Sequence, residues 1–236
     1  MKLIKQMVFW IIGIIHFTLL GQNNFFDSAN SFFNQQVRDG LVDYSSIFSD
    51  QKELDILIGS IESFDIESAT KDEQLSFYIN AYNLLVIKNV IDHFPINSPM
   101  DVPGFFEKKR FKVAHKELSL NELENEIIRP EFNDPRIHFA LVCGAISCPP
   151  IIPMAYFPKN VHELLDRQTN SAIEDSNFTI VNKQEVSLSQ IFNWYKIDFG
   201  GNDEAIIQFI NQYREKKVLS NSRINYYHYD WKLNIQ

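Results

Sequence analysis

Apolar residues recur at helical spacing in several stretches of the chain, and the longest such pattern lies within residues 74–94. There the sequence QLSFYINAYNLLVIKNVIDHF places apolar side chains three and four residues apart, so that they form one wide face of a helix. This pattern predicts a long central helix. Shorter helices are predicted within residues 23–43, where Asp39 and Gly40 end the helix, and over residues 51–60, 161–173 and 203–216.

A strand, a turn, a second strand and a helix start follow one another twice in the chain. Residues 110–113 form the first predicted strand, and residues 114–117 form a turn. Ser119 and Glu122 then have the spacing of a capping box, which opens a helix to about residue 129. The same order returns over residues 178–195, and residues 136–143 and 224–233 have the apolar and aromatic content of two further strands.

The predicted strands and helices are interleaved without the regular alternation of a parallel βαβ fold, which favours the α+β class. We predict a single globular domain over residues 22–236, with a mixed or antiparallel sheet packed on the long central helix. The chain has 20 Phe, which supply a substantial core, and no segment has the composition of a linker.

The first residues have the order of charged and apolar residues that is typical of a secretory signal peptide. Lys2 and Lys5 precede the uncharged run MVFWIIGIIHFTLL, which is shorter than the roughly 20 residues of a membrane-spanning helix. We predict that residues 1–21 are a signal peptide cleaved near Gly21 and Gln22. The domain is then exported as a periplasmic or secreted protein and keeps no membrane span.

The predicted mature domain is acidic. Residues 1–21 contain two of the 22 Lys and Arg residues and no Asp or Glu, so 20 basic side chains stand against 30 acidic ones. This balance argues against nucleic acid as a partner, because the phosphate backbone requires basic surface. We expect the partner to be a peptide, a glycan or a small polar ligand.

Both cysteines lie in the segment RIHFALVCGAISCPP at residues 136–150, which leads from an apolar strand into a loop with Gly and Pro. Functional residues concentrate on such loops. In a regular strand Arg136 and His138 share one face, whereas Cys143 lies on the other. A direct contact between Cys143 and His138 therefore requires a bulge or a sharp turn, while Cys148 is less constrained.

Three interpretations of the two cysteines are open. Export and the even cysteine count favour a disulfide between Cys143 and Cys148, worth only roughly 2 kcal/mol because the loop is short. Alternatively, one cysteine is a reduced nucleophile that His138 activates. Metal binding is the third interpretation, but neither a second ligand pair nor an HExxH motif accompanies the C-x4-C spacing. We predict no metal site and no cofactor.

Three motifs in this order resemble the DUF547 family of uncharacterised proteins: YINAYNLLVIKNV at residues 78–90, PRIHFALVCGAISCPP at residues 135–150 and YDWKLN at residues 229–234. The resemblance covers about residues 72–234 and implies a shared fold and a common site, without an established activity. The site residues that it implies are Asn80, Asn83, Arg136, His138, Cys143 and Cys148. Where the family often has Ile-Glu-His, this chain has Leu123-Glu124-Asn125, so no histidine role carries over at that position.

Asn80 and Asn83 are three residues apart and therefore lie on one side of the predicted central helix. Asn is a poor helix former, so two amides in an apolar helix require an explanation. In one interpretation they hydrogen-bond neighbouring backbone groups, as buried amides must. In the other they line a pocket with His138 and Arg136 and bind a polar ligand or orient the imidazole.

Aromatic residues gather near the end of the chain, at Tyr226, Tyr227, Tyr229 and Trp231. They could stack on a carbohydrate. Alternating aromatic residues in a strand are also typical of its core and rim, which is the simpler interpretation.

Two functional hypotheses follow from these residues. The first is a thiol hydrolase or transferase, with Cys143 or Cys148 as nucleophile, His138 as base, and Asn80, Asn83 or Glu124 as the orienting group. The alternative is a non-catalytic peptide- or glycan-binding module with a disulfide-locked loop and a pocket of Asn, His and Arg side chains. A structural protein of the cell envelope without a small ligand is a third hypothesis.

Overall fold

The structure is a computed structural model that describes residues 25–176, 178–182 and 184–236. The predicted signal peptide and its cleavage site lie outside these residues. No helix in the described part is long and apolar enough to cross a membrane.

Residues 25–36 form the first helix. The elements that follow are β1 (Val37–Arg38), β2 (Leu41–Val42), α2 (Tyr44–Ser49), α3 (Lys52–Ser63), α4 (Lys71–His93), η1 (Pro99–Asp101), β3 (Arg110–Val113), β4 (Lys116–Ser119), α5 (Leu120–Glu122), the π-helical turn η2 (Leu123–Ile128), α6 (Arg129–Phe132), the 3-10 helix η3 (Pro135–Phe139), α7 (Val161–Glu174), β5 (Thr179–Asn182), β6 (Glu185–Leu188), α8 (Ile191–Trp194), α9 (Asp203–Tyr213) and β7 (Arg223–Tyr226).

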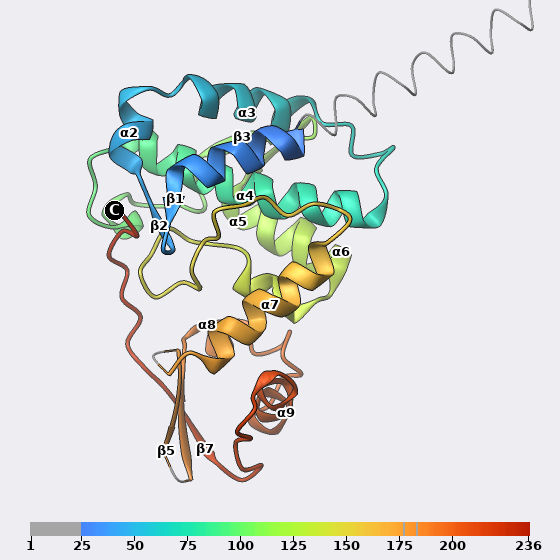
Figure 1. Cartoon of the computed structure of the whole chain (residues 1–236), viewed down its shortest axis with the longest axis vertical. Helices are drawn as coiled ribbons and strands as arrows, with labels where there is room; N and C mark the ends of the chain where they lie inside the picture. The colour runs from blue at the N-terminus through green and yellow to red at the C-terminus, as the bar shows by residue number, and fades with distance from the viewer. Residues whose placement is uncertain (1–24, 177, 183) are drawn as a thin grey trace, which may run out of the picture.

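The predicted central helix is confirmed as α4. Thr70 and Glu73 form a capping box at its N-terminus, in which each side chain bonds the other residue's backbone N–H. Between Leu75 and Ile91 almost every residue of α4 is buried, since α2, α3, α7 and η2 all pack against it. Figure 1 shows α4 running through the upper half of the molecule beneath α3.

Strands in the described residues are confined to three small sheets. The pairs β1–β2 and β3–β4 are antiparallel hairpins. In the third sheet β6 lies between the antiparallel β5 and the parallel β7. Both predicted strand–turn–strand units are therefore present, and the mixture of helices with small sheets confirms the α+β class.

The predicted strand over residues 136–143 is wrong, because Pro135–Phe139 form the 3-10 helix η3. The Asp134 side chain accepts a hydrogen bond from the Arg136 N–H, and Pro135 supplies a φ angle suited to a helix start. A helical turn therefore replaces the extended chain that the apolar pattern suggested.

The predicted closing strand over residues 224–233 is also shorter than expected, since pairing ends at Tyr226. The following residues run alongside the cysteine loop, where Ile146 N–H donates to the Lys232 carbonyl at 2.8 Å. The end of the chain then reaches β2, with Val42 N–H donating to the Asn234 carbonyl at 2.8 Å. Figure 1 shows this closing segment passing from β7 up to β2.

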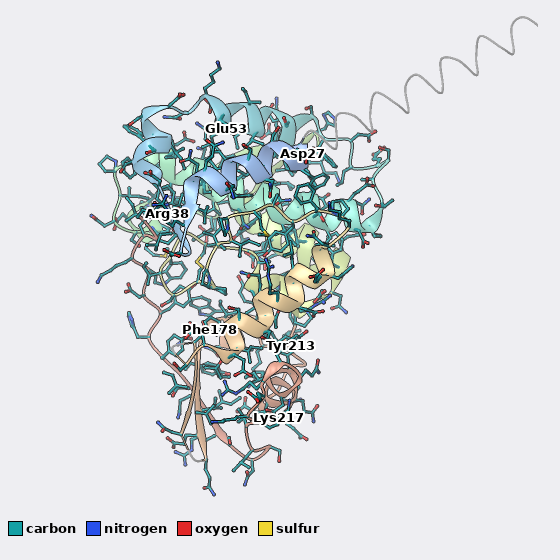
Figure 2. All side chains as sticks on the ribbon, in the orientation of Figure 1. Asp27, Arg38, Glu53, Phe178, Tyr213 and Lys217 are labelled. Atoms are coloured by element: carbon teal, nitrogen blue, oxygen red, sulfur yellow. A yellow bond between two sulfur atoms is a disulfide. The ribbon has the colours of Figure 1, made fainter. Side chains whose placement is uncertain are left out.

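Phenylalanine rings join η3 to the lower half of the molecule. The Phe139 ring lies 6.0 Å from Phe178 and 5.9 Å from Phe192, centroid to centroid. Figure 2 shows Phe178 beside the end of α7, where the chain enters β5. This aromatic packing fixes η3 and α8 relative to each other, and both contribute to the site described next.

Candidate functional site

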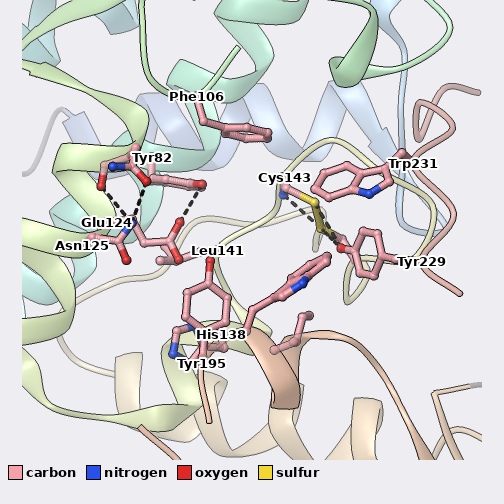
Figure 3. Close-up of a pocket in the computed structure, with 14 residues that line it drawn as sticks. Tyr82, Phe106, Glu124, Asn125, His138, Leu141, Cys143, Tyr195, Tyr229 and Trp231 are labelled. Atoms are coloured by element: carbon pink, nitrogen blue, oxygen red, sulfur yellow. Dashed lines mark hydrogen bonds between the residues drawn. A yellow bond between two sulfur atoms is a disulfide. The ribbon is translucent and has the colours of Figure 1, made fainter. Parts of the chain in front are cut away.

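A pocket with a volume of about 220 Å³ lies where α4, η2, the cysteine loop, α8 and the closing segment meet (Figure 3). Its walls combine polar and aromatic side chains. The lining residues are Tyr82, Phe106, Asn121, Glu124, Asn125, His138, Leu141, Cys143, Cys148, Ile191, Trp194, Tyr195, Tyr229 and Trp231.

Glu124 supplies the acidic group of the pocket and is only 7% exposed. It lies in the π-helical turn η2, a wider turn that is frequent at functional sites. The Tyr82 hydroxyl donates to Glu124 Oε2 at 2.9 Å, and Tyr195 lines the same pocket. Burial, followed by the nearby Glu124 charge, raises the pKa of Tyr82 and of Tyr195 well above the ordinary value, so both phenols remain donors.

His138 lines the pocket and is held on two sides. Its Nε2 is 2.7 Å from Asp198 Oδ2, and its ring stacks on Tyr195 with a centroid distance of 3.9 Å. The imidazole is therefore fixed against Tyr195, another residue that lines the pocket. Only 1% of the His138 side chain is exposed, so the imidazole presents little surface to the pocket.

Asp198 accepts hydrogen bonds from both His138 and Arg129. Arg129 binds it in a bidentate manner, with Nε 2.7 Å from Oδ2 and Nη2 2.8 Å from Oδ1. Burial acts to raise the pKa of Asp198, but the hydrogen bonds from His138 and Arg129 outweigh burial and lower this pKa. The guanidinium of Arg129 also lies over the Tyr195 ring, 5.0 Å from its centroid. Asp198 thus anchors the groups behind the pocket.

Cys143 and Cys148 form a disulfide with a Cα–Cα distance of 6.4 Å, as one interpretation of the sequence predicted. Gly144 follows Cys143 with a φ of 78°, a conformation that a residue with a side chain adopts only with strain. The Tyr229 hydroxyl donates to Cys148 Sγ at 3.0 Å and lies 3.2 Å from Cys143 Sγ. The disulfide and Tyr229 together form one wall of the pocket (Figure 3).

Three aromatic rings form a cluster beside the disulfide. The Trp194 ring centroid lies 4.9 Å from that of Tyr229 and 5.7 Å from that of Trp231. Tyr229 and Trp231 are 4.8 Å apart, and Trp194 is 47% exposed. Tyr229 and Trp231 of this aromatic cluster face Glu124 across the pocket (Figure 3), and Trp194 also lines it.

Asn80 and Asn83 do not line the pocket, and both bind backbone. Asn80 Nδ2 donates to the Tyr156 carbonyl at 2.8 Å, and its Oδ1 accepts from the Tyr156 N–H at 2.9 Å. Asn83 Nδ2 donates to the Ala140 carbonyl at 2.9 Å, and its Oδ1 accepts from the Val142 N–H at 2.8 Å. Asn83 thus fixes the chain directly before the disulfide, as the structural interpretation of these amides expects.

Arg136 also lies away from the pocket. Its guanidinium binds Asp134 at 2.9 Å and Asp166 at 2.8 Å. The sequence placed Arg136 beside His138 because alternate residues of a strand share a face. In the 3-10 helix that forms instead, residues two apart point in different directions. The structure therefore brings together Glu124, His138 and both cysteines, and separates Arg136 from them.

The sequence did not single out Tyr82, Trp194, Tyr195 or Asp198. In the sequence, Tyr82 lies on the apolar face of the predicted central helix, and Tyr195 lies at the end of the second predicted strand–turn–strand–helix unit. Their contacts join residues far apart in the chain, such as Asp198 and His138, so local spacing carries no signal for them. Within the described ranges, no group of three or more His, Cys, Asp or Glu side chains is arranged to hold a metal ion.

Residues 66–173 match the model of a family described as "Protein of unknown function, DUF547". Comparison with curated proteins and with solved structures gives no match. The matched residues include the first two of the three motifs and, within the pocket, Glu124, His138 and the two cysteines. Residues 66–173 of the chain therefore belong to the DUF547 family.

Proposed function

We propose that the pocket binds a glycan without covalent chemistry and holds one sugar ring between Glu124 and the aromatic cluster of Trp194, Tyr229 and Trp231. The observation that carries this proposal is a fixed carboxylate, Glu124, that faces Tyr229 and Trp231 across one small pocket, which Trp194 also lines. Of the two hypotheses from the sequence, this is the binding module with a disulfide-locked loop.

The disulfide favours binding over thiol hydrolysis. A thiol hydrolase requires a free thiolate as nucleophile. In this structure Cys143 and Cys148 are bonded to each other, and the chain has no other cysteine. His138, the proposed base, directs Nε2 at Asp198.

The aromatic cluster fits the chemistry of a sugar ring. A pyranose has apolar C–H faces, which pack on aromatic rings, and hydroxyl groups around its edge. The partly exposed Trp194 and the half-buried Trp231 offer such ring surfaces, and the buried Tyr229 packs against both.

Glu124 supplies the acceptor for the sugar hydroxyls. A carboxylate has about four lone-pair sites, and Tyr82 donates to one oxygen of Glu124, which leaves acceptor capacity for a ligand. Asn121 and Asn125 add amides at the same wall. No Lys or Arg is among the described residues that line the pocket, so the site favours a neutral ligand over an anionic one.

Tryptophan fluorescence of the full chain, titrated with a panel of neutral oligosaccharides, tests this proposal. Trp194 and Trp231 are two of the three tryptophans and both line the pocket, so bound ligand must alter the emission. Glu124→Gln is expected to weaken binding at least about tenfold, the effect of losing one charged hydrogen bond. Glu126→Gln is the matched control, since Glu126 lies in the same turn η2 but is exposed and outside this pocket.

Two outcomes would overturn the proposal. One is a saturable response to short neutral peptides with none to any sugar. The other is an equal loss of sugar binding in the Glu124→Gln and Glu126→Gln variants, because the pocket would then not be the binding site.

A further inference from the structure

The two sulfur atoms of the disulfide differ in their surroundings. Cys143 is half-buried, whereas Cys148 is 8% exposed, and both line the pocket. Cys148 Sγ accepts two hydrogen bonds, one from the Tyr229 hydroxyl at 3.0 Å and one from the Cys143 backbone N–H at 3.0 Å. Cys143 Sγ is therefore the more accessible sulfur. The Tyr229 hydroxyl also lies 3.2 Å from Cys143 Sγ, but only Cys148 Sγ accepts the additional backbone N–H.

We propose that the Cys143–Cys148 disulfide exchanges with thiols that enter the pocket, with Cys143 as the attacked sulfur and Cys148 as the leaving group. This activity goes beyond glycan binding and does not depend on it. Its substrate class is a small dithiol, or two monothiols in succession, and the disulfide of the protein is the oxidant.

The exchange has two steps, and in each step one bond to sulfur forms while another breaks. In the first, a substrate thiolate attacks Cys143 Sγ, the Cys143–Cys148 bond breaks, and its electron pair leaves on Cys148 as a thiolate. In the second, another substrate thiolate attacks the substrate sulfur of the mixed disulfide and releases Cys143 as a thiolate. The substrate is oxidised to its disulfide, and the two protein sulfurs are reduced.

Hydrogen bonding to the charged form explains the direction of this exchange. A thiolate on Cys148 gains the donors that already point at its sulfur, and such bonds favour the charged form. Burial raises the pKa of Tyr229 far above its ordinary value, so its hydroxyl keeps its proton while the thiolate forms. A lower pKa of the leaving thiol speeds exchange.

The charge of the pocket selects among thiols. Glu124 lines the opposite wall, and no Lys or Arg is among the described lining residues. A thiol that carries an ammonium group is therefore attracted, and one that carries a carboxylate is repelled.

The first test uses mass spectrometry of the full chain to identify which cysteine the thiol attacks. The oxidised protein is mixed with cysteamine, quenched with acid, and alkylated with iodoacetamide. Cysteamine is expected on Cys143 and the alkyl group on Cys148. Cysteamine found mainly on Cys148, or no reaction on the timescale of cysteamine with a small-molecule disulfide, would overturn the proposal. No sugar is used, so this result and that of the glycan titration are independent.

Rates in two tyrosine variants are the second test. Tyr229→Phe removes one donor to Cys148 and is expected to slow the first step about tenfold. Tyr226→Phe is the matched control, because the Tyr226 hydroxyl is buried and has no hydrogen-bond partner in the described residues. Equal rates in the two variants would mean that Tyr229 does not stabilise the leaving sulfur, and would overturn the assigned direction.

Comparison of two thiol probes is the third test. At equal thiolate concentration, cysteamine is expected to react several-fold faster than 3-mercaptopropionate, and Glu124→Gln to reduce this preference. A preference for the carboxylate probe would contradict the proposed approach through the pocket.

Discussion

The segment matched by the family model, residues 66–173, and the C-terminal segment, residues 174–236, contribute different chemistry to the pocket. The family segment supplies Glu124, His138 and the disulfide. The described part of the C-terminal segment supplies the three rings of the aromatic cluster. Neither segment alone forms the pocket. The residues matched by the family model include the polar groups of the site but not the aromatic cluster.

The two hairpin–helix units show the same contrast on a smaller scale. After β3 and β4, Ser119 and Glu122 cap a helix start, and the chain widens into η2 to place Glu124 in the pocket. After β5 and β6, the short helix α8 places Trp194 and Tyr195 there. The two units share a local fold but place different side chains in the pocket. The helix that follows each hairpin determines which residues reach it.

Removal of the Asp198 carboxylate, which joins the two segments, is expected to have the largest effect on stability. Asp198, in the C-terminal segment, binds Arg129 and His138 in the family segment. Asp198→Asn is expected to lower the free energy of unfolding by about 2–3 kcal/mol, less than for a fully buried pair, because the Asp198 side chain is 21% exposed.

Thermal unfolding of the variant measures this loss. Asp203→Asn is the matched control, because Asp203 pairs with Lys196 at the surface and its loss is expected to cost at most about 0.5 kcal/mol. If both variants unfold at the same temperature, Asp198 does not hold the two segments together.

Lowering the pH is expected to weaken the interaction of Asp198 with Arg129 and His138. The resulting loss of stability should be smaller than that caused by the substitution. The pKa of Asp198 is lowered in the folded protein, so its contribution to stability is fully present above the ordinary Asp pKa of about 3.9. This contribution is lost as the pH falls below that value towards the folded pKa. Melting temperatures of the wild type and Asp198→Asn should therefore converge below about pH 4. A difference that grows on acidification would contradict the lowered pKa.

The elements predicted from the sequence are those with strong local signals. The apolar face of α4, the capping box at Ser119 and the two hairpins all depend on residues within a few positions of one another. The disulfide, one of three interpretations of the two cysteines, was favoured by the even cysteine count and the predicted export, and the structure contains it.

The sequence predictions that fail do so for two reasons. Either two local patterns compete in one segment, or the decisive contacts join residues that are far apart in the chain. Residues 136–143 have the apolar content of a strand, but Asp134 and Pro135 start a helical turn. The Ala140 carbonyl and the Val142 N–H then hydrogen-bond the Asn83 side chain instead of a neighbouring strand. Strand parity therefore placed Arg136 beside His138, whereas its guanidinium binds Asp134 and Asp166 away from the pocket. The bonds of His138 to Asp198 and of Glu124 to Tyr82 span 60 and 42 residues, beyond the reach of any local pattern.

The smallest effect on stability is expected from the disulfide, which lies where the two segments meet. Replacing Cys143 and Cys148 together by Ser is expected to cost about 1–2 kcal/mol, a few degrees in melting temperature, since the closed loop is short. Asn83 holds the chain before the loop, and the Asn234 N–H donates to the Gly144 carbonyl at 3.0 Å, so the backbone keeps its supports.

Ligand binding should suffer more than stability in this double variant. Tyr229 bonds the sulfur of Cys148, so its ring is expected to lose its fixed position beside Trp194 and Trp231 when the disulfide is absent. Calorimetric unfolding and the fluorescence titration with oligosaccharides, run on the same preparation, separate the two effects. A fall of more than about 10 °C in melting temperature together with unchanged sugar affinity would show the reverse, that the disulfide supports the fold and leaves the pocket unaffected.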